Sequence, residues 1–351
     1  MIIKAKADDN LNEILNTKVE GKLQVELPSG CIYRQKVKVE RSDLIVIGNG
    51  AKIVWDDHNG MRPGFGTGAS ATLTICSDRV EFRDTVIEND FDYLGHEAKA
   101  GEDPKVMMGR QAVAVFTRPE STDSVFKNCT FISWQDTLFA DGAENRFEHC
   151  TIKGNIDFIF GRSHAVFDRC TIISTGSGFV AAPSTSGNTE EGLCFERCTI
   201  TCTDDVKDAS VYLARPWHPS ERDDTNSYVS FSDCTLDRHI NSGLWTTMWD
   251  KKGHNHLPSE NRFHIDDKTL KTRRNAMEKI LKEIDLQDCP LCGGPAVLEE
   301  EGSWCFYVMC MDCGCHTAEI PYSSPEERLT SAKNAAHLWN IGKVLRSDPG
   351  E

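Results

Sequence analysis

A short phrase, consisting of an aromatic residue, two variable residues and then Cys-Thr, recurs along the middle of the chain and constrains the fold most strongly. The cysteines of its successive full copies are 21, 20, 28 and 36 residues apart. A repeat of about 20 residues, rich in β-branched residues and interrupted by Asn, Gly and Asp, predicts the stacked coils of a parallel β-solenoid. The full copies begin at Phe126, Phe147, Phe167, Phe195 and Phe231, and a degenerate copy begins at Phe82.

The repeat also turns sequence offsets into distances. Asp136 lies seven residues after Cys129, and Asp157 lies seven residues after Cys150. If each Cys-Thr pair occupies the same place in its coil, the two acids lie on neighbouring coils, about 4.8 Å apart along the stack. Two carboxylates placed in this way repel each other, so one pKa should rise and the other acid needs a cation. We therefore expect the active site at these two acids.

Composition bounds the class of protein. The chain has 351 residues, enough for one solenoid and a small second unit, and it contains no apolar run approaching the roughly 20 residues that cross a membrane. The net charge of −15 argues against non-specific binding of nucleic acid over the whole surface. An acidic substrate would therefore depend on local cations.

The cysteines and the N-terminus together indicate a compartment. The chain has 15 cysteines, and five of them belong to the repeated phrase, where a free thiol behaves as a small buried apolar group. A disulfide network is the alternative explanation. The first residues lack a basic segment followed by a long apolar one, so we expect a reducing, cytoplasmic location.

Polar residues recur at the ends of strands that occupy equivalent places in successive coils. We expect these residues to converge on one face of the solenoid, with aromatic residues between them, an arrangement that suits a sugar. We expect Asn89–Gly109 to be a polar loop at the rim of this face. The expected strands are Gln111–Phe116, Gln135–Ala140, Ile156–Phe160, Gly178–Ala182 and Val211–Arg215. The converging residues are Gln111, Gln135, Asp136, Asp157 and Arg215, with Trp134, Phe158 and Trp217.

The end of the chain predicts a second unit. Two Cys-x-x-Cys pairs, each followed by Gly and separated by 17 residues, are typical of a zinc ribbon, and four thiolates leave no open position for catalysis. Cys305 and Cys315 lie nearby but lack the paired spacing, and a capping box at Ser324 predicts a helix to about Val344. The expected zinc ligands are Cys289, Cys292, Cys310 and Cys313. The expected units are a mainly β solenoid at 1–266, a helical linker at 267–286 and an α+β ribbon at 287–351.

Three strings in the solenoid resemble the blocks of the pectin methylesterases, in their order and spacing: Trp134-Gln-Asp-Thr-Leu, Gly154-Asn-Ile-Asp-Phe-Ile-Phe-Gly and Leu213-Ala-Arg-Pro-Trp. The resemblance spans about residues 25–265 and implies a right-handed parallel β-helix. It also implies a carboxylic ester hydrolase that acts on methyl-esterified polygalacturonate or oligogalacturonides. The chain departs from the family pattern at Ala214, where Gly is usual, and at Leu244, which is inserted before Trp245. The family residues carried over are Gln111, Gln135, Asp136, Asp157, Arg215 and Trp217, with Trp245 as a second aromatic. The tail is similar to Lar-like restriction-alleviation zinc ribbons of phages and prophages.

The chemistry of a methyl ester assigns a role to each polar residue. Asp157 would attack the carbonyl carbon, and Arg215 would keep it ionised and oriented. Asp136 would act first as acid and then as base, while Gln111 and Gln135 would donate to the oxyanion. No cofactor is expected for this chemistry, and the zinc would be structural.

The sequence allows three alternative interpretations to be considered. A pectate-lyase-like solenoid should carry a calcium-binding acid cluster, and the sequence shows none that we can assemble. The second is an esterase of this fold that acts on a different esterified glycan. The third is a non-catalytic binder of phage or prophage origin, contacting glycan, nucleic acid or protein, in part through the ribbon.

Overall fold

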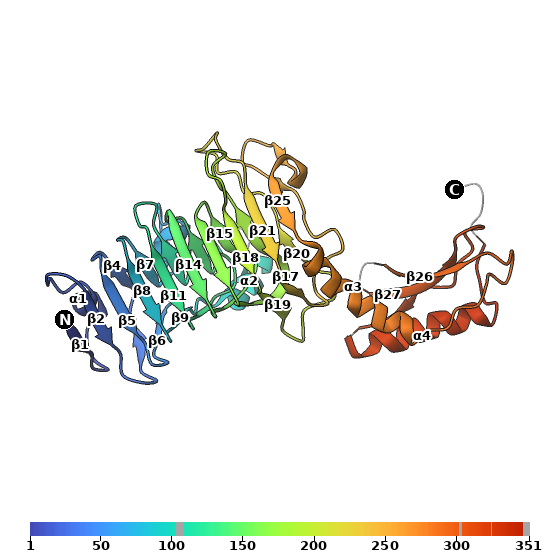
Figure 1. Cartoon of the computed structure of the whole chain (residues 1–351), viewed down its shortest axis with the longest axis horizontal. Coiled ribbons are helices and arrows are strands. Elements are labelled where there is room, and N and C mark those ends of the chain that lie inside the picture. The colour runs from blue at the N-terminus through green and yellow to red at the C-terminus, as the bar shows by residue number, and fades with distance from the viewer. Residues whose placement is uncertain (103–108, 302–303, 324, 347–351) are drawn as a thin grey trace.

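The computed structural model describes residues 1–102, 109–301, 304–323 and 325–346. Short parallel strands stack along one axis into a solenoid, and helix α3 (Asp267–Lys282) leads from its end to a smaller unit (Figure 1). Each unit has its own apolar core, one formed by residues between 5 and 265 and the other by residues between 280 and 344. Among the described residues, no helix is long and apolar enough to cross a membrane.

One wall of the solenoid is a ten-stranded parallel sheet whose order follows the chain. Every coil contributes one strand to it, which confirms the stacking predicted from the repeat. Its strands are β1 (Ile2–Lys4), β2 (Leu23–Glu26), β5 (Leu44–Ile47), β8 (Val80–Arg83), β11 (Ser124–Lys127), β14 (Glu144–Glu148), β16 (His164–Asp168), β18 (Leu193–Glu196), β21 (Tyr228–Ser232) and β25 (Arg262–Ile265).

The other two walls belong to one branched sheet. They merge at two long strands, β15 (Thr151–Gly161) and β17 (Thr171–Pro183), which bend from one wall into the next. The first of these walls contains β3 (Ile32–Arg34), β6 (Lys52–Trp55), β9 (Val86–Asn89), β12 (Thr130–Ile132), β19 (Thr199–Cys202) and β22 (Thr235–Leu236). The second contains β4 (Val37–Val39), β7 (Leu73–Ile75), β10 (Val115–Thr117), β13 (Leu138–Ala140) and β20 (Val211–Ala214).

The repeated phrase fills the interior. Its phenylalanines form a column in which consecutive rings from Phe126 to Phe231 stack with centroids 4.5–5.2 Å apart, and all of these rings are buried. Each cysteine of the phrase donates to the carbonyl oxygen of the phenylalanine one coil earlier, as Cys150 Sγ does to Phe126 O at 3.4 Å. The phrase therefore repeats because each copy packs on the copy before it.

The residue before each of these cysteines, or before Thr85 in the degenerate copy, turns the corner. It adopts a left-handed backbone conformation that ends the strand of the ten-stranded wall and starts the next wall. Glycine and Asn tolerate this conformation best, and other residues lose about 1–2 kcal/mol in it. The corner residues are Asp84, Asn128, His149, Arg169, Arg197 and Asp233, with φ between 48° and 54°.

The N-terminal end of the stack is covered by helix α1 (Leu11–Leu15), whose Leu11 and Leu15 are buried in the solenoid core. A turn of 3₁₀ helix, Thr67–Ser70, precedes β7, and a second, Pro258–Glu260, precedes β25. Between β22 and β25 lies a small antiparallel pair, β23 (Met248–Trp249) and β24 (Asn255–His256).

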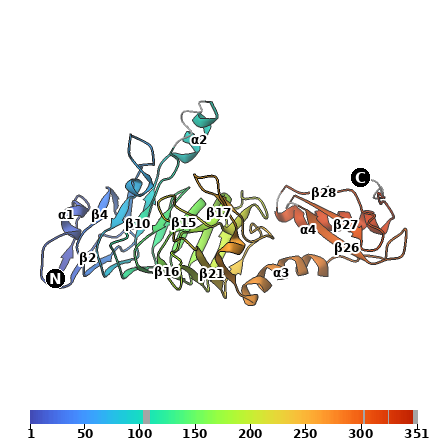
Figure 2. The ribbon, with the colours of Figure 1, turned by 90° about the horizontal axis from the view of Figure 1, so that it is seen from above.

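One expected loop contains a helix. Within Asn89–Gly109, residues Tyr93–Glu102 form α2, which projects from the side of the stack that carries β10 and β15 (Figure 2). Gly95 and Gly101 break the apolar periodicity that would have indicated it, so the prediction of a loop was wrong there. The Asp92 side chain accepts a hydrogen bond from Gly95 N at 3.0 Å at the start of the helix.

The C-terminal unit packs a three-stranded antiparallel sheet against one helix. The sheet consists of β26 (Ala296–Glu301), β27 (Cys305–Cys310) and β28 (Ile320–Pro321), and the helix is α4 (Pro325–Asn340). Trp339 is wholly buried between them. The helix ends before the predicted Val344 because Gly342, with φ 75°, turns the chain. Ser324, the predicted cap, lies outside the described residues.

Candidate active site

The two acids predicted from the repeat lie on neighbouring coils. Asp136 comes just before β13 and Asp157 lies within β15, and these strands pair with Leu138 opposite Ile159. The Asp136 amide donates to Ile156 O at 3.1 Å, which ties the two segments together. Both acids are nearly buried, with 8% and 7% of their surface exposed. The two acids are therefore neighbours, as the repeat spacing predicts.

Both acids also adopt a left-handed backbone conformation, with φ 66° at Asp136 and 49° at Asp157. The pairing of β15 with β17 shifts register between Gly154 and Ile159, so β15 bends at Asp157. Side chains with a Cβ atom adopt such conformations at a cost, and residues kept in them gather at functional sites. The bend directs the two carboxylates out of the regular strand alternation.

Arg215 holds Asp157 with a two-pronged ion pair. It follows β20, and its Nε and Nη2 donate to the two carboxylate oxygens of Asp157 at 2.8 and 2.6 Å. The guanidinium lies over the ring of Phe179, 3.8 Å from its centroid. Charge-assisted bonds to both oxygens fix the plane of the carboxylate. Asp157 is therefore held in one orientation by a cation.

Asp136 lies in different electrostatic surroundings. Burial raises its pKa well above the ordinary value, and the negative charge of Asp157 raises it further. Arg215 and a hydrogen bond from Gln135 oppose this effect but do not cancel it. The surroundings of Asp136 thus favour its protonated form, while its neighbour Asp157 is paired with an arginine, and two carboxyl groups in such different environments suit acid and nucleophile roles.

The two glutamines lie on the coils beside these acids. The Ala112 amide, next to Gln111, donates to Gln135 O at 3.1 Å, so the two glutamine segments are neighbours. The side-chain Nδ2 of Asn59 donates to Gln111 Oε1 at 2.8 Å, and the backbone N–H of Asn59 donates to the backbone oxygen of Gln111 at 2.8 Å. Because Oε1 of the Gln111 side chain accepts this bond, its Nε2 is the group that can donate to a substrate.

Sequence reasoning missed Asn59. Its segment approaches so closely that a Cβ atom on Gly109 (φ 92°) would lie 1.7 Å from Asn59 O. Asn59-Gly60 has the appearance of an ordinary turn, and it belongs to no repeat. Nothing local in the sequence indicates that this asparagine supports Gln111.

Two predicted aromatics lie on the outer face and two contact the interior. Trp217 is half-buried, with its ring 5.6 Å from that of Phe160, and Trp134 stacks on Tyr93 of α2 at 5.4 Å. Phe158 is wholly buried and packs against Gly154, where a Cβ atom would lie 2.3 Å from Phe158 Cβ. The prediction that Phe158 contacts a sugar is therefore wrong, because the residue after the bend at Asp157 turns into the core.

Trp245 is half-buried against the rings of Phe231 and Phe263, at 5.9 and 5.3 Å. The inserted Leu244 adopts a left-handed conformation, with φ 59°, just before it. The insertion thus turns Trp245 toward core residues. Its sugar contact stays a prediction.

A row of three phenylalanines on the outer face was also missed. Phe116, Phe139 and Phe160 occupy paired positions on β10, β13 and β15, and their rings stack at 4.4 and 4.3 Å. Phe139 and Phe160 each follow an acid by three residues, so the offset that located the acids would have located these rings too. The row runs toward Trp217; Phe116 and Phe160 are nearly buried, so Phe139 and Trp217 form most of its exposed apolar surface, which suits the face of a sugar ring.

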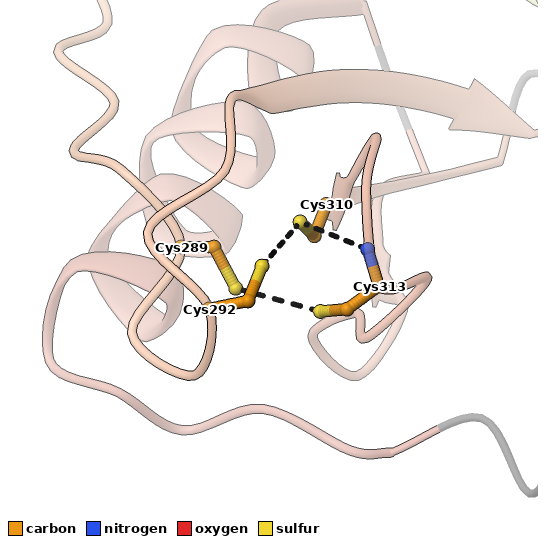
Figure 3. Close-up of side chains that lie close together, drawn as sticks. All are labelled: Cys289, Cys292, Cys310 and Cys313. Atoms are coloured by element: carbon orange, nitrogen blue, oxygen red, sulfur yellow. Dashed lines mark hydrogen bonds between the residues drawn. The ribbon is translucent and has the colours of Figure 1, made fainter.

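The cysteines predicted to bind zinc cluster at the two knuckles of the C-terminal unit (Figure 3). The sulfur atoms of Cys289, Cys292, Cys310 and Cys313 all lie within 4.8 Å of one another. Backbone N–H groups donate to three of these sulfurs, as Gly294 N does to Cys292 Sγ at 3.4 Å. Such bonds stabilise thiolates, so the cluster fits a tetrahedral metal ion.

The two flanking cysteines differ in their relation to this cluster. Cys315 Sγ lies 3.4 Å from Cys289 Sγ and 3.5 Å from Cys313 Sγ, at the edge of the cluster. Cys305 instead contacts Glu301 O. The knuckle spacing therefore selected the four sulfurs that surround a common centre.

Comparison with known proteins identifies the solenoid. The family model described as Pectinesterase matches residues 8–256. The chain belongs to the pectinesterase family. Pectinesterase A of Dickeya chrysanthemi is 30% identical over 259 residues, which cover 66% of this chain and 71% of that protein.

Solved pectin methylesterases share the fold. PemA from Erwinia chrysanthemi matches with a TM-score of 0.67 at 26% identity, over 75% of this chain and 87% of its own. The enzyme from Yersinia enterocolitica matches with a TM-score of 0.67 at 29% identity, over 73% and 88%. A pectin methylesterase solved with a hexasaccharide matches with a TM-score of 0.68 at 26% identity, over 75% and 87%. The predicted right-handed parallel β-helix is thereby confirmed.

The C-terminal unit has a different likeness. Residues 284–343 match the model of restriction alleviation protein Lar. This agrees with the resemblance seen in the sequence, and the pectinesterase match ends before this region.

Proposed function

We propose that this pectinesterase removes methyl groups from esterified galacturonate in pectin or in pectic oligosaccharides. The observation that carries the proposal is the pair of neighbouring carboxyl groups in different surroundings, with Asp157 held by Arg215 and the pKa of Asp136 raised by burial and by Asp157. Relatives named as pectinesterases and a pectin methylesterase solved with a hexasaccharide support the substrate class.

The first half of the reaction forms an acyl-enzyme. A carboxylate oxygen of Asp157 attacks the ester carbonyl carbon, and the carbonyl oxygen becomes an oxyanion that accepts hydrogen bonds from the amides of Gln111 and Gln135. The carbon–oxygen bond to the methoxy group then breaks. Asp136 gives its proton to the departing oxygen, so methanol leaves and a mixed anhydride with Asp157 remains.

The second half returns the enzyme to its starting state. Asp136, now a carboxylate, takes a proton from a water molecule as the water attacks the anhydride. The anhydride opens, the galacturonic acid group leaves with the second proton of the water, and Asp157 is again an anion paired with Arg215. Asp136 ends the cycle protonated as it began, and the product acid releases its proton to the solvent, so the net change is one ester and one water converted to methanol, a galacturonate carboxylate and one proton.

The sugar chain would lie across the outer face beside the carboxylates. The ring of Phe139, stacked between those of Phe116 and Phe160, would contact a ring face, with Trp217 at one end of the row and Trp134 near α2. The polymer and short oligomers differ in how many of these positions they fill. Methanol release from esterified pectin, compared with release from short esterified oligogalacturonides, will decide between them.

Substitution of Asp157 tests the mechanism. Asp157→Asn keeps the shape of the side chain but removes the nucleophile, so turnover should fall at least ~10³-fold, since losing a nucleophile removes most of the catalysis. Asp168→Asn is a matched control, because Asp168 is also held by an arginine, Arg197, outside the site. Methanol release by the Asp157 variant above a few per cent of wild type would refute the assignment. Lack of activity in the wild type on either substrate would favour a different esterified glycan or a binding protein.

The C-terminal cluster is proposed to hold one structural zinc through Cys289, Cys292, Cys310 and Cys313. Four thiolates around one centre match the closed structural sites of this metal. Elemental analysis of the purified chain should find this zinc, and replacing Cys292 by Ser should remove one ion per chain.

The setting of the enzyme and the role of the ribbon are further proposals. A cytoplasmic location is favoured because the thiols of the interior column donate hydrogen bonds that oxidation would abolish. Fractionation of cells that produce the chain will test it. Contact of the ribbon with nucleic acid has little electrostatic support, since residues 287–351 contain four Lys or Arg against ten Asp or Glu. Protein contact stays a prediction.

A further inference from the structure

A second cluster of metal-binding residue types lies at the C-terminal end of the solenoid. Cys202 ends β19, and Asp237 and His239 follow β22, which pairs with β19. One sulfur, one carboxylate oxygen and one ring nitrogen from these residues lie within 4.8 Å of one another. The three residues take no part in ester hydrolysis.

His239 is a buried histidine whose ring nitrogens are not hydrogen-bonded to any described residue. It is 0% exposed. Leaving a buried polar group unsatisfied costs about 1–3 kcal/mol, so native proteins fill such sites with a partner, a water molecule or an ion. Ser174, the register neighbour of Cys202 on β17, also has a buried hydroxyl without a partner among those residues. This corner of the solenoid therefore contains buried polar groups that lack hydrogen-bond partners among the described residues.

We propose that Cys202, Asp237 and His239 bind a divalent metal ion of the zinc class. A thiolate, an imidazole and a carboxylate together form a donor set that zinc accepts, with a fourth position left for water. Zinc holds such ligands about 3.3–3.8 Å apart, given its bond lengths of about 2.0–2.3 Å. The ligands would need to close by about one ångström, and the exposed Asp237 can make that movement by rotation.

The surroundings orient the ligands and limit the local positive charge. Asp237 accepts from Thr201 Oγ1 at 2.8 Å and from the Arg238 backbone N–H at 2.7 Å, and a carboxylate oxygen bound to a metal ion can keep such a bond through its second lone pair. The nearest cation, Arg238, is engaged by the Asp208 carboxylate and by the carbonyl oxygens of Val206 and Asp204. Its charge is therefore largely compensated and does not exclude a metal ion.

The site would also lie at the junction of the two units. Asp208 contacts Arg328 of α4 at 3.6 Å, and Arg328 is paired with Glu300 of the ribbon sheet. A metal ion on Cys202 and Asp237 would join the end of β19, where the loop that carries Asp208 begins, to the end of β22. The proposed ion thus fixes the point where the solenoid meets the ribbon.

A similar cluster elsewhere provides a control. His164, Glu191 and Cys194 also lie within 4.8 Å of one another. There the histidine is half-buried, its Nδ1 is hydrogen-bonded to Glu144 at 2.7 Å, and its Nε2 lies 3.4 Å from Glu191 without forming a hydrogen bond. Because one of its nitrogens already has a partner, unlike either nitrogen of His239, we expect this cluster not to bind a metal ion.

Metal counting on the full-length chain tests the proposal. After purification with zinc and removal of free ions, the wild type should contain two zinc ions per chain, one of them in the four-cysteine cluster. Cys202→Ser and Asp237→Asn should each contain one, and Cys194→Ser should keep two. A wild type with one ion, or a Cys202→Ser variant that keeps the wild-type count, would overturn the proposal and leave a water molecule as the partner of His239.

Cobalt gives a second measurement that does not depend on counting. Replacing zinc by cobalt should produce thiolate-to-cobalt absorption from both sites, and Cys202→Ser should lose the smaller share. Asp237→Asn preserves the shape of an exposed side chain and should therefore fold even if the cysteine variant does not. An unchanged cobalt spectrum in both variants would contradict the site.

Discussion

The solenoid and the ribbon both place cysteines next to tight left-handed turns, but the sulfur atoms have opposite roles. In the solenoid, Cys150 donates its hydrogen to Phe126 O, so it must remain a thiol. In the ribbon, Cys289 and Cys310 accept hydrogen bonds from backbone N–H groups, which stabilises the thiolate. One set acts as apolar packing and the other is arranged as metal ligands would be. The partner atom, and not the residue type, decides between them.

This contrast predicts the largest effect. Chelating the metal should unfold the ribbon, because structural zinc contributes on the order of 10 kcal/mol or more to the folding of such small units. The solenoid buries its own core and should keep most of its esterase activity. Limited proteolysis and methanol release, measured on the same chelated sample, will check both parts.

Matched cysteine variants sharpen the test. Cys310→Ser should expose the ribbon to protease without added chelator. Cys150→Ser, buried in the solenoid, should leave the ribbon protected because its hydroxyl can donate to the same carbonyl. Loss of esterase activity together with the ribbon would show that the two units do not act separately.

The same contrast between sites applies to arginine–carboxylate pairs. The side chains of Arg215 and Asp157 are 21% and 10% exposed, whereas the side chain of Arg197 is 42% exposed where it pairs with Asp168 on the outer surface. Arg215→Lys should lower turnover about 10²-fold, since a point charge cannot bond both oxygens in one plane. Arg197→Lys should leave turnover unchanged. A fully active Arg215→Lys enzyme would mean that only the charge matters.

Asp136 should affect the stability of the folded protein as well as its activity. The pKa of Asp136 is higher in the folded state than in the unfolded state, so the folded state holds the extra proton and stability falls as pH rises through this interval. Asp136→Asn removes that loss. It should raise the melting temperature at neutral pH while lowering turnover by about 10²-fold or more.

Wild-type activity should also fall as pH rises through the raised pKa of Asp136, because the general acid is lost. The two carboxyl groups titrate as a coupled pair, so the measured value describes the pair. An Asp136→Asn variant less stable than wild type at neutral pH would contradict the assigned direction.

The sequence predicted those parts of the solenoid in which the same packing contact recurs from coil to coil. The Phe-x-x-Cys phrase located the coils because each copy contacts its neighbours, and the shared offset located Asp136 and Asp157 for the same reason. The clustering of the four knuckle cysteines was predictable because a knuckle has fixed spacing. In each case, a local pattern had a direct structural consequence.

The rest depended on tertiary contacts. Asn59 supports Gln111 from a segment outside the repeat, and α2 contains glycines that hide its periodicity. Phe158 was wrongly predicted to contact a sugar, because the bend at Asp157 changes which side chains face inward and no residue pattern predicts that bend. The site was thus predictable where it follows the repeat and not where irregular backbone reaches into it.

The smallest expected effect concerns the corners themselves. The ribbon uses glycine at its left-handed turns, Gly293 and Gly314, whereas the solenoid places Arg169 at one, with φ 51°. Arg169→Gly and Arg169→Ala both remove the ion pair with Asp168, but only Gly relieves the strain at Cβ. The Gly variant should therefore be more stable than the Ala variant by about 1 kcal/mol, or about 2 °C in melting temperature.

The sign should reverse at Arg146, an exposed residue within β14, because glycine in a regular strand loses more conformational freedom on folding. There Arg146→Ala should be more stable than Arg146→Gly by about 0.5–1 kcal/mol. Melting curves of the four variants give both differences. If glycine were worse than alanine at both positions, the corners would carry no strain, and the solenoid's use of arginine where the ribbon uses glycine would need no compensation from packing.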